Sequence, residues 1–145
     1  MWTTEHSIET DLSPSALYDV MSDVTTWPRW NAGVERMELN GPFTAGTTGV
    51  MHMPGQDRLD FTLAWVEPGK GFEDVTPIPQ TDVVVTVRHT LDALASGRTR
   101  ITYACRIDGA GSDEMGPVIG PEITADFPEV MASLVRYVED STHAG

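Results

Sequence analysis

The middle of the chain is a succession of short segments of alternating polarity, and only its last third carries an apolar stripe at helical spacing. Alternating side chains predict half-buried strands, and glycine- and proline-containing turns separate these segments from one another. Short turns between successive strands favour an antiparallel sheet in which sequence neighbours pair. We expect strands at residues 2–9, 34–39, 47–53, 58–67, 71–76, 81–92 and 98–108.

The apolar stripe near the C-terminus predicts the helix that covers this sheet. An antiparallel sheet with one apolar face needs a cover, and the sequence offers no other long stripe. Pro128 interrupts it, and Asp126 with Glu129 fits a new helix start, so a kinked helix and two consecutive helices both satisfy the sequence. The members of the stripe are Ile119, Ile123, Phe127, Val130, Met131, Leu134 and Val138.

Two shorter elements follow the first strand. Ser13 and Pro14 provide an N-cap hydroxyl and a proline at the first helical position, which predicts a short helix over residues 15–21. Residues 23–30 come next, and we expect their two tryptophans to anchor this segment by packing. The expected fold class is therefore α+β, a strongly bent antiparallel sheet of about seven strands around a long C-terminal helix, with two short helices after the first strand.

The composition and net charge of the chain exclude several classes of function. The chain has 145 residues, 40% hydrophobic and 21% charged, which is typical of a single folded domain over 1–145. Its net charge of −13 repels phosphate backbones and anionic lipids, so we expect no nucleic-acid partner and no membrane insertion. Cys105 is the only cysteine, which excludes an intrachain disulfide. No signal peptide is evident, so a cytoplasmic location is expected.

Several short stretches carry a resemblance that spans nearly the whole chain. They are DVTTWPRWN at 23–31, GPF at 41–43 with GT at 46–47, RHTL at 88–91, GRTR at 97–100 and GPEI at 120–123. Together with the order of elements, they resemble the polyketide cyclase/dehydrase-like family of the START-like (SRPBCC, helix-grip) superfamily. The resemblance implies a helix-grip fold with a deep cavity between the sheet and the last helix that holds an apolar or aromatic ligand.

The two longest predicted strands reveal which face is buried. Five residues separate 81–92 from 98–108, an odd number, so odd-numbered residues pair with odd-numbered residues across the hairpin. The odd set is apolar apart from His89 and Tyr103, whereas the even set contains Arg88, Arg100 and Arg106. The odd face is therefore expected to be buried, with His89 and Tyr103 close together on it.

The same alternation assigns the other side chains that would line a ligand cavity. Phe61 and Trp65 share an inward face in 58–67. The orientation of Asp74 is not decided by the alternation, because Phe72 on the same strand would bring it inward but a strand carboxylate is commonly solvated. Apolar walls supply affinity and isolated polar groups orient the ligand. The expected ligand-binding set is Phe61, Trp65, Asp74, Val87, His89, Tyr103, Cys105, Ile119, Phe127 and Met131.

His89 is the candidate catalytic residue, with Tyr103 beside it. A half-buried imidazole with a pKa near neutrality can act as general acid or base, and a phenol can donate to the same ligand oxygen. The alternative is that the two satisfy each other in a packed core. Cys105 lacks a nearby cation and is expected to be inert. The histidines lack metal-ligand spacing, so we expect no metal and no cofactor.

Three functions follow. The first is binding of a hydrophobic small molecule, polyketide- or lipid-like, with the cyclase or dehydratase activity that the resemblance implies. The second is a non-catalytic carrier or sensor, which the outward-facing arginines slightly favour. The third is an interaction module with a filled core, without a cavity of roughly 300 Å³ between sheet and helix. The sequence leaves the ligand open, and both a monomer and a homodimer satisfy it.

Overall fold

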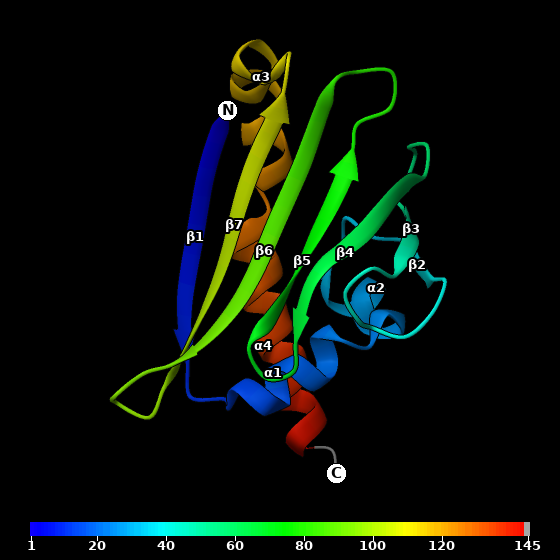
Figure 1. Cartoon of the computed structure of the whole chain (residues 1–145). Helices are drawn as coiled ribbons and strands as arrows, with labels where there is room; N and C mark the ends of the chain where they lie inside the picture. The colour runs from blue at the N-terminus through cyan, green and yellow to red at the C-terminus, as the bar shows by residue number, and fades with distance from the viewer. Residues whose placement is uncertain (144–145) are drawn as a thin grey trace.

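The computed structural model describes residues 1–143, so the last two residues of the expected domain 1–145 lie outside it. Seven antiparallel strands form one bent sheet in the order β1-β7-β6-β5-β4-β3-β2 (Figure 1), which confirms the predicted α+β architecture. The strands are β1 (Trp2–Thr10), β2 (Arg36–Leu39), β3 (Thr48–His52), β4 (Leu59–Glu67), β5 (Gly71–Pro77), β6 (Val83–Ala93) and β7 (Thr99–Gly109).

Helices follow the first strand and the last strand. At the start of the first helix, the Ser13 hydroxyl accepts a hydrogen bond from the Ala16 N–H at 3.1 Å, and Pro14 occupies the first turn, as predicted. Of the two alternatives for the C-terminal stripe, the structure has two consecutive helices. None of the helices within residues 1–143 is long and apolar enough to span a bilayer. The helices are α1 (Pro14–Met21), η1 (Val24–Thr26), α2 (Trp27–Trp30), α3 (Ser112–Thr124) and α4 (Phe127–His143).

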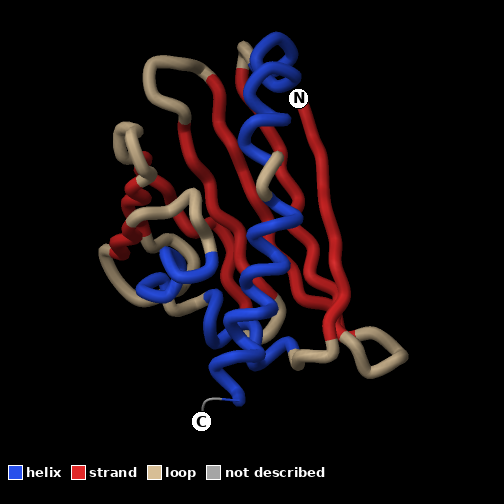
Figure 2. The backbone as a smooth tube through the Cα atoms, turned by 180° about the vertical axis from the view of Figure 1, so that it is seen from behind, coloured by secondary structure: helices blue, strands red, loops and turns tan. Residues whose placement is uncertain are grey.

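The core lies between the sheet and the two C-terminal helices. Figure 2 shows α3 and α4 following one another across one face of the sheet. The apolar stripe of α4 is buried, with Met131 and Leu134 wholly inaccessible, and the helix packs against β1, α1 and α2. Because burying such side chains is the main favourable term in folding, the stripe fixes the helix on the sheet.

A tryptophan of β1 lies against two glycines of α3. Gly116 and Gly120 face the Trp2 ring so closely that a Cβ atom at Gly120 would lie 2.5 Å from a ring carbon, and one at Gly116 would overlap the Trp2 side chain. Glycine is about 1 kcal/mol less favourable than alanine inside a helix. The close approach of indole and helix backbone is the physical reason that glycine occupies these positions.

We expect Gly120→Ala to destabilise the protein by about 1–3 kcal/mol, because overpacking against Trp2 outweighs the better helix propensity of alanine. Urea unfolding measures the effect. Val118→Ala, on the exposed side of the same helix, is the control and should change stability by less than about 0.5 kcal/mol. In a Trp2→Ala background the penalty of Gly120→Ala should disappear. A stabilised Gly120→Ala protein would contradict the packing argument.

One irregularity reverses the alternation of β4. The pairing of β4 with β5 shifts between Leu63 and Trp65, so Ala64 is an extra residue and Trp65 lies opposite Glu73. The Arg88 guanidinium lies 4.3 Å from the centre of the Trp65 ring, on the outer face of the sheet. The predicted inward orientation of Trp65 is therefore wrong, because strict alternation does not survive a β-bulge. Val66 takes the inward position opposite Phe72.

Candidate functional site

A row of ring-bearing side chains crosses four strands on the inner face. Phe72 of β5 pairs with His89 of β6, His89 pairs with Tyr103 of β7, and Tyr103 pairs with His6 of β1. His89 stacks on Phe72 with centroids 4.1 Å apart, and the Tyr103 ring meets it edge-on at 4.4 Å. The predicted odd-with-odd register is confirmed, and it places His89 directly opposite Tyr103.

Further aromatic rings connect this row to the helices. Tyr103 contacts Phe127 at the start of α4, with centroids 5.4 Å apart, and Phe72 contacts Trp27 at 5.8 Å and Phe43 at 5.2 Å. These rings occupy the interior at the level of His89. The imidazole is consequently only 7% exposed, whereas the sequence predicted a half-buried one.

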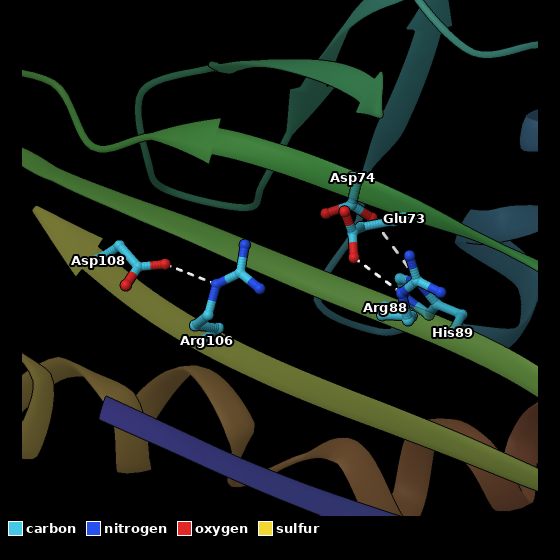
Figure 3. A network of polar contacts seen from close by, with 6 residues as sticks. All are labelled: Glu73, Asp74, Arg88, His89, Arg106 and Asp108. Carbon is cyan, nitrogen blue, oxygen red and sulfur yellow. Dashed lines mark hydrogen bonds and ion pairs between the residues drawn. The ribbon is translucent and has the colours of Figure 1, made fainter. Parts of the chain in front are cut away.

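Asp74 lies one row further along the same inner face. It pairs with Leu63 on one side and Val87 on the other, and it keeps the inward orientation of Phe72 two residues earlier. Its side chain is 20% exposed, and its Oδ2 lies 3.9 Å from Nδ1 of His89 (Figure 3). That distance exceeds hydrogen-bond range, and the buried Nδ1 has no hydrogen-bond partner among the described residues. The orientation that the sequence left open for Asp74 is thus the inward one.

Burial shifts the pKa values of His89 and Asp74 in opposite directions. Loss of hydration lowers the pKa of His89 to about 3, so the imidazole is neutral at pH 7 and the expectation of a near-neutral pKa is wrong. Loss of hydration, followed by the charge of Glu73, raises the pKa of Asp74 to about 7. Asp74, rather than His89, is therefore the group that exchanges a proton near neutrality.

The neighbouring phenol and thiol stay protonated. Burial raises the pKa of Tyr103 far above its usual value, and the negative charges of Asp74 and Asp126 add to the effect. Burial, then the charge of Asp74, raises the pKa of the Cys105 thiol to about 11. Tyr103 is thus a hydrogen-bond donor at neutral pH, and Cys105 lacks the thiolate that a nucleophile needs.

The outer face of the sheet carries the cations instead. Arg88 Nε lies 2.9 Å from a Glu73 carboxylate oxygen and Arg106 Nε lies 2.6 Å from one of Asp108, both shown in Figure 3. A hollow of about 430 Å³ lies over this face, on side chains of β1, β5, β6 and β7. A second, of about 660 Å³, lies beside His52 and residues 53–57. Neither hollow lies between the sheet and α4, where the resemblance implies a cavity.

A family model described as "Polyketide cyclase / dehydrase and lipid transport" matches residues 1–139. The chain belongs to this family. The match covers the sheet, α1, η1, α2, α3 and nearly all of α4, so it includes every residue of the inner-face row. No curated protein sequence matches the chain.

Solved structures share the fold of this family member at low sequence identity. Ara h 8.0201 is 13% identical, with a TM-score of 0.76 over 95% of this chain and 97% of its own. Norcoclaurine synthase from Thalictrum flavum is 15% identical, with a TM-score of 0.72 over 94% and 85%. Protein MLL2253 from Mesorhizobium loti is 17% identical, with a TM-score of 0.73 over 97% and 98%. At such identities the likeness shows the fold alone.

The structure brings most of the predicted ligand-binding residues to the inner side of this polyketide cyclase-type fold. Trp65 is the exception, and the functional roles of the others remain predictions. Sequence reasoning missed the charge of Asp126, an exposed residue between α3 and α4, because its spacing indicated only a helix cap. No group of three or more metal-ligating side chains within residues 1–143 could hold a metal ion. The inner-side residues are Phe61, Asp74, Val87, His89, Tyr103, Cys105, Ile119, Phe127 and Met131.

The pKa shifts of Asp74 and His89 should make the free energy of unfolding depend on pH in opposite directions. With a pKa raised from 3.8 to about 7, folded Asp74 retains a proton that the unfolded chain releases, so its contribution falls as the pH rises from about 4 to about 7. With a pKa lowered from 6.5 to about 3, His89 contributes stability that rises between about pH 3 and pH 6.5.

Relative to wild type, Asp74→Asn should therefore gain stability as the pH rises from 4 to 7, and His89→Asn should lose it from pH 3 to 6.5. Each slope is at most about 1.4 kcal/mol per pH unit. Urea melts at half-unit intervals measure these slopes, and any constant offset reflects lost packing. Asp60→Asn, an exposed position of β4, is the control and should run parallel to wild type. Parallel curves for all three variants would contradict the assigned protonation.

Proposed function

We propose that the protein binds an apolar or aromatic small molecule between the inner face of the sheet and α3 and α4, oriented by Asp74, His89 and Tyr103. The observation that carries this proposal is a buried imidazole nitrogen without a hydrogen-bond partner, beside an inward carboxyl group on an otherwise apolar face. Buried polar atoms are normally paired, so a ligand group is a natural partner. The family description, which names cyclases, dehydrases and lipid transport, supports the same class of ligand.

The partly exposed inner-face residues indicate where the ligand lies. Asp74, Val87 and Ile119 are half-buried, whereas His89 and Tyr103 are buried among aromatic rings. A ligand would therefore contact Asp74 and Val87 on the sheet and Ile119 on α3. Pro117 and Pro121 lie inside α3 and each removes a backbone hydrogen bond, so α3 is the less rigid of the two covering helices and the one that would shift to admit a ligand.

The chemistry available at this place is proton exchange with the ligand. Asp74, with a pKa of about 7, can give or accept a proton at neutral pH, and Tyr103 can donate a hydrogen bond to a carbonyl oxygen. Neutral His89 would serve as a hydrogen-bonding partner rather than as the acid or base. A cyclase or dehydratase would use Asp74 for proton transfer, whereas a carrier would use the same groups for orientation only.

Native mass spectrometry after incubation with an extract of the host cell tests the proposal. We expect a low-molecular-weight compound to remain bound after buffer exchange. A compound recovered unchanged supports a carrier, and one converted over time establishes an enzyme. If nothing is retained, the proposal is wrong and the filled-core interaction module is favoured.

A pair of variants on β6 locates the bound compound. Val87 lies between Asp74 and Cys105 on the inner face, so Val87→Phe fills the space beside Asp74 and should reduce retention about tenfold or more. Val84→Phe adds the same ring to the outer face of the same strand and should retain the compound as wild type does. Thermal melts establish that both variants are folded. Undiminished retention by Val87→Phe would place the ligand elsewhere, with the outer-face hollow as the next candidate.

A further inference from the structure

The inner face contains a carboxyl group and no cation to balance it. All nine lysines and arginines of the chain are exposed to solvent. Arg88 lies on the neighbouring strand opposite Glu73, and its guanidinium forms an ion pair with that carboxylate on the outer face. His89 is neutral, so it does not balance the carboxylate. The one other side chain whose charge acts strongly on Asp74 is Glu73, which has the same sign.

Two acceptors on this face converge on one place. Asp74 Oδ2 and His89 Nδ1 lie 3.9 Å apart, too far to bond to each other. A single nitrogen donor placed between them can lie about 2.8 Å from both atoms. An ammonium group has three N–H donors and satisfies both acceptors at once, whereas a ligand hydroxyl has only one hydrogen to donate.

The surroundings favour positive charge. His89 is nine-tenths buried, with the Phe72 ring stacked on it and the Tyr103 ring against its edge. An ammonium in this low-dielectric setting interacts with a carboxylate more strongly than it does in water. The protein's net charge of −13 raises the local concentration of cations further.

We propose that the ligand carries a protonated amine on its apolar or aromatic body, and that the ammonium group binds between the Asp74 carboxylate and Nδ1 of His89. This inference rests on the proposed function and narrows its substrate class. It makes Asp74 the counter-ion of the ligand and His89 its second acceptor.

Three probes of one shape and different charge test the inference. Tryptamine, tryptophol and indole-3-propanoate share an indole and differ in bearing a cationic, neutral or anionic end. Isothermal titration at pH 8, above the pKa of about 7 of Asp74, measures each affinity. We expect tryptamine to bind about tenfold or more tightly than tryptophol, and indole-3-propanoate to bind most weakly.

The charged and titratable groups around Asp74 define the controls. They are Glu73 on its own strand, His89 on β6, and Tyr103 and Cys105 on β7, with Asp126 acting on Tyr103 from beyond α3. Asp74→Asn should equalise tryptamine and tryptophol, because tryptamine loses its counter-ion and tryptophol loses at most one hydrogen bond. Glu73→Gln removes a carboxylate one residue away on the outer face and should keep the preference for tryptamine.

The outcomes separate this inference from the proposed function. Tryptophol binding as tightly as tryptamine, or a preference that survives Asp74→Asn, would overturn the amine assignment and leave the apolar site intact. Failure of all three probes to bind would also overturn it, and native mass spectrometry of the host extract then decides on its own whether the site holds an apolar ligand of another class.

Discussion

The stacking of Phe72 on His89 is the contact on which the chemistry of the inner face depends. Burial among aromatic rings keeps the imidazole neutral, so His89 provides no positive charge beside Asp74. Asp74 then lies on an apolar face without a counter-ion, and its carboxyl group binds a proton more tightly than in water. The protonation states of His89 and Asp74 thus both follow from their burial within the fold.

The two covering helices are held by different kinds of contact. The buried stripe of α4 joins it to β1, α1 and α2, whereas α3 lies on β1 through the flat approach of Trp2 to two glycines. Because the Trp2 ring lies directly on the helix backbone at these glycines, this contact depends on a small separation between α3 and β1. The helix that lies against Trp2 is also the one that contains two prolines, and it packs on β1 and β7.

Much of this arrangement could be predicted from the sequence, because it depends on local alternation. The register of β6 and β7 is regular, so the parity of the intervening loop placed His89 opposite Tyr103. The protonation of His89 could not be predicted, since it depends on burial among side chains from other strands. Trp65 was misplaced because a bulge at an alanine has no signature in residue type. Pro128 marked a helix break without distinguishing a kink from a new start.

The bulge at Ala64 also has a consequence for how such an interior varies. Beyond the bulge, Trp65 points outward and Val66 inward, although the two residues are adjacent. Loss of the single extra residue would restore the regular pleat and leave both faces unchanged, because Leu63, Trp65 and Val66 already lie opposite Asp74, Glu73 and Phe72 in alternation. A deletion of one codon at this position is thus expected to leave the lining of the interior as it is, whereas a one-residue slip elsewhere in β4 would turn its side chains to the opposite face.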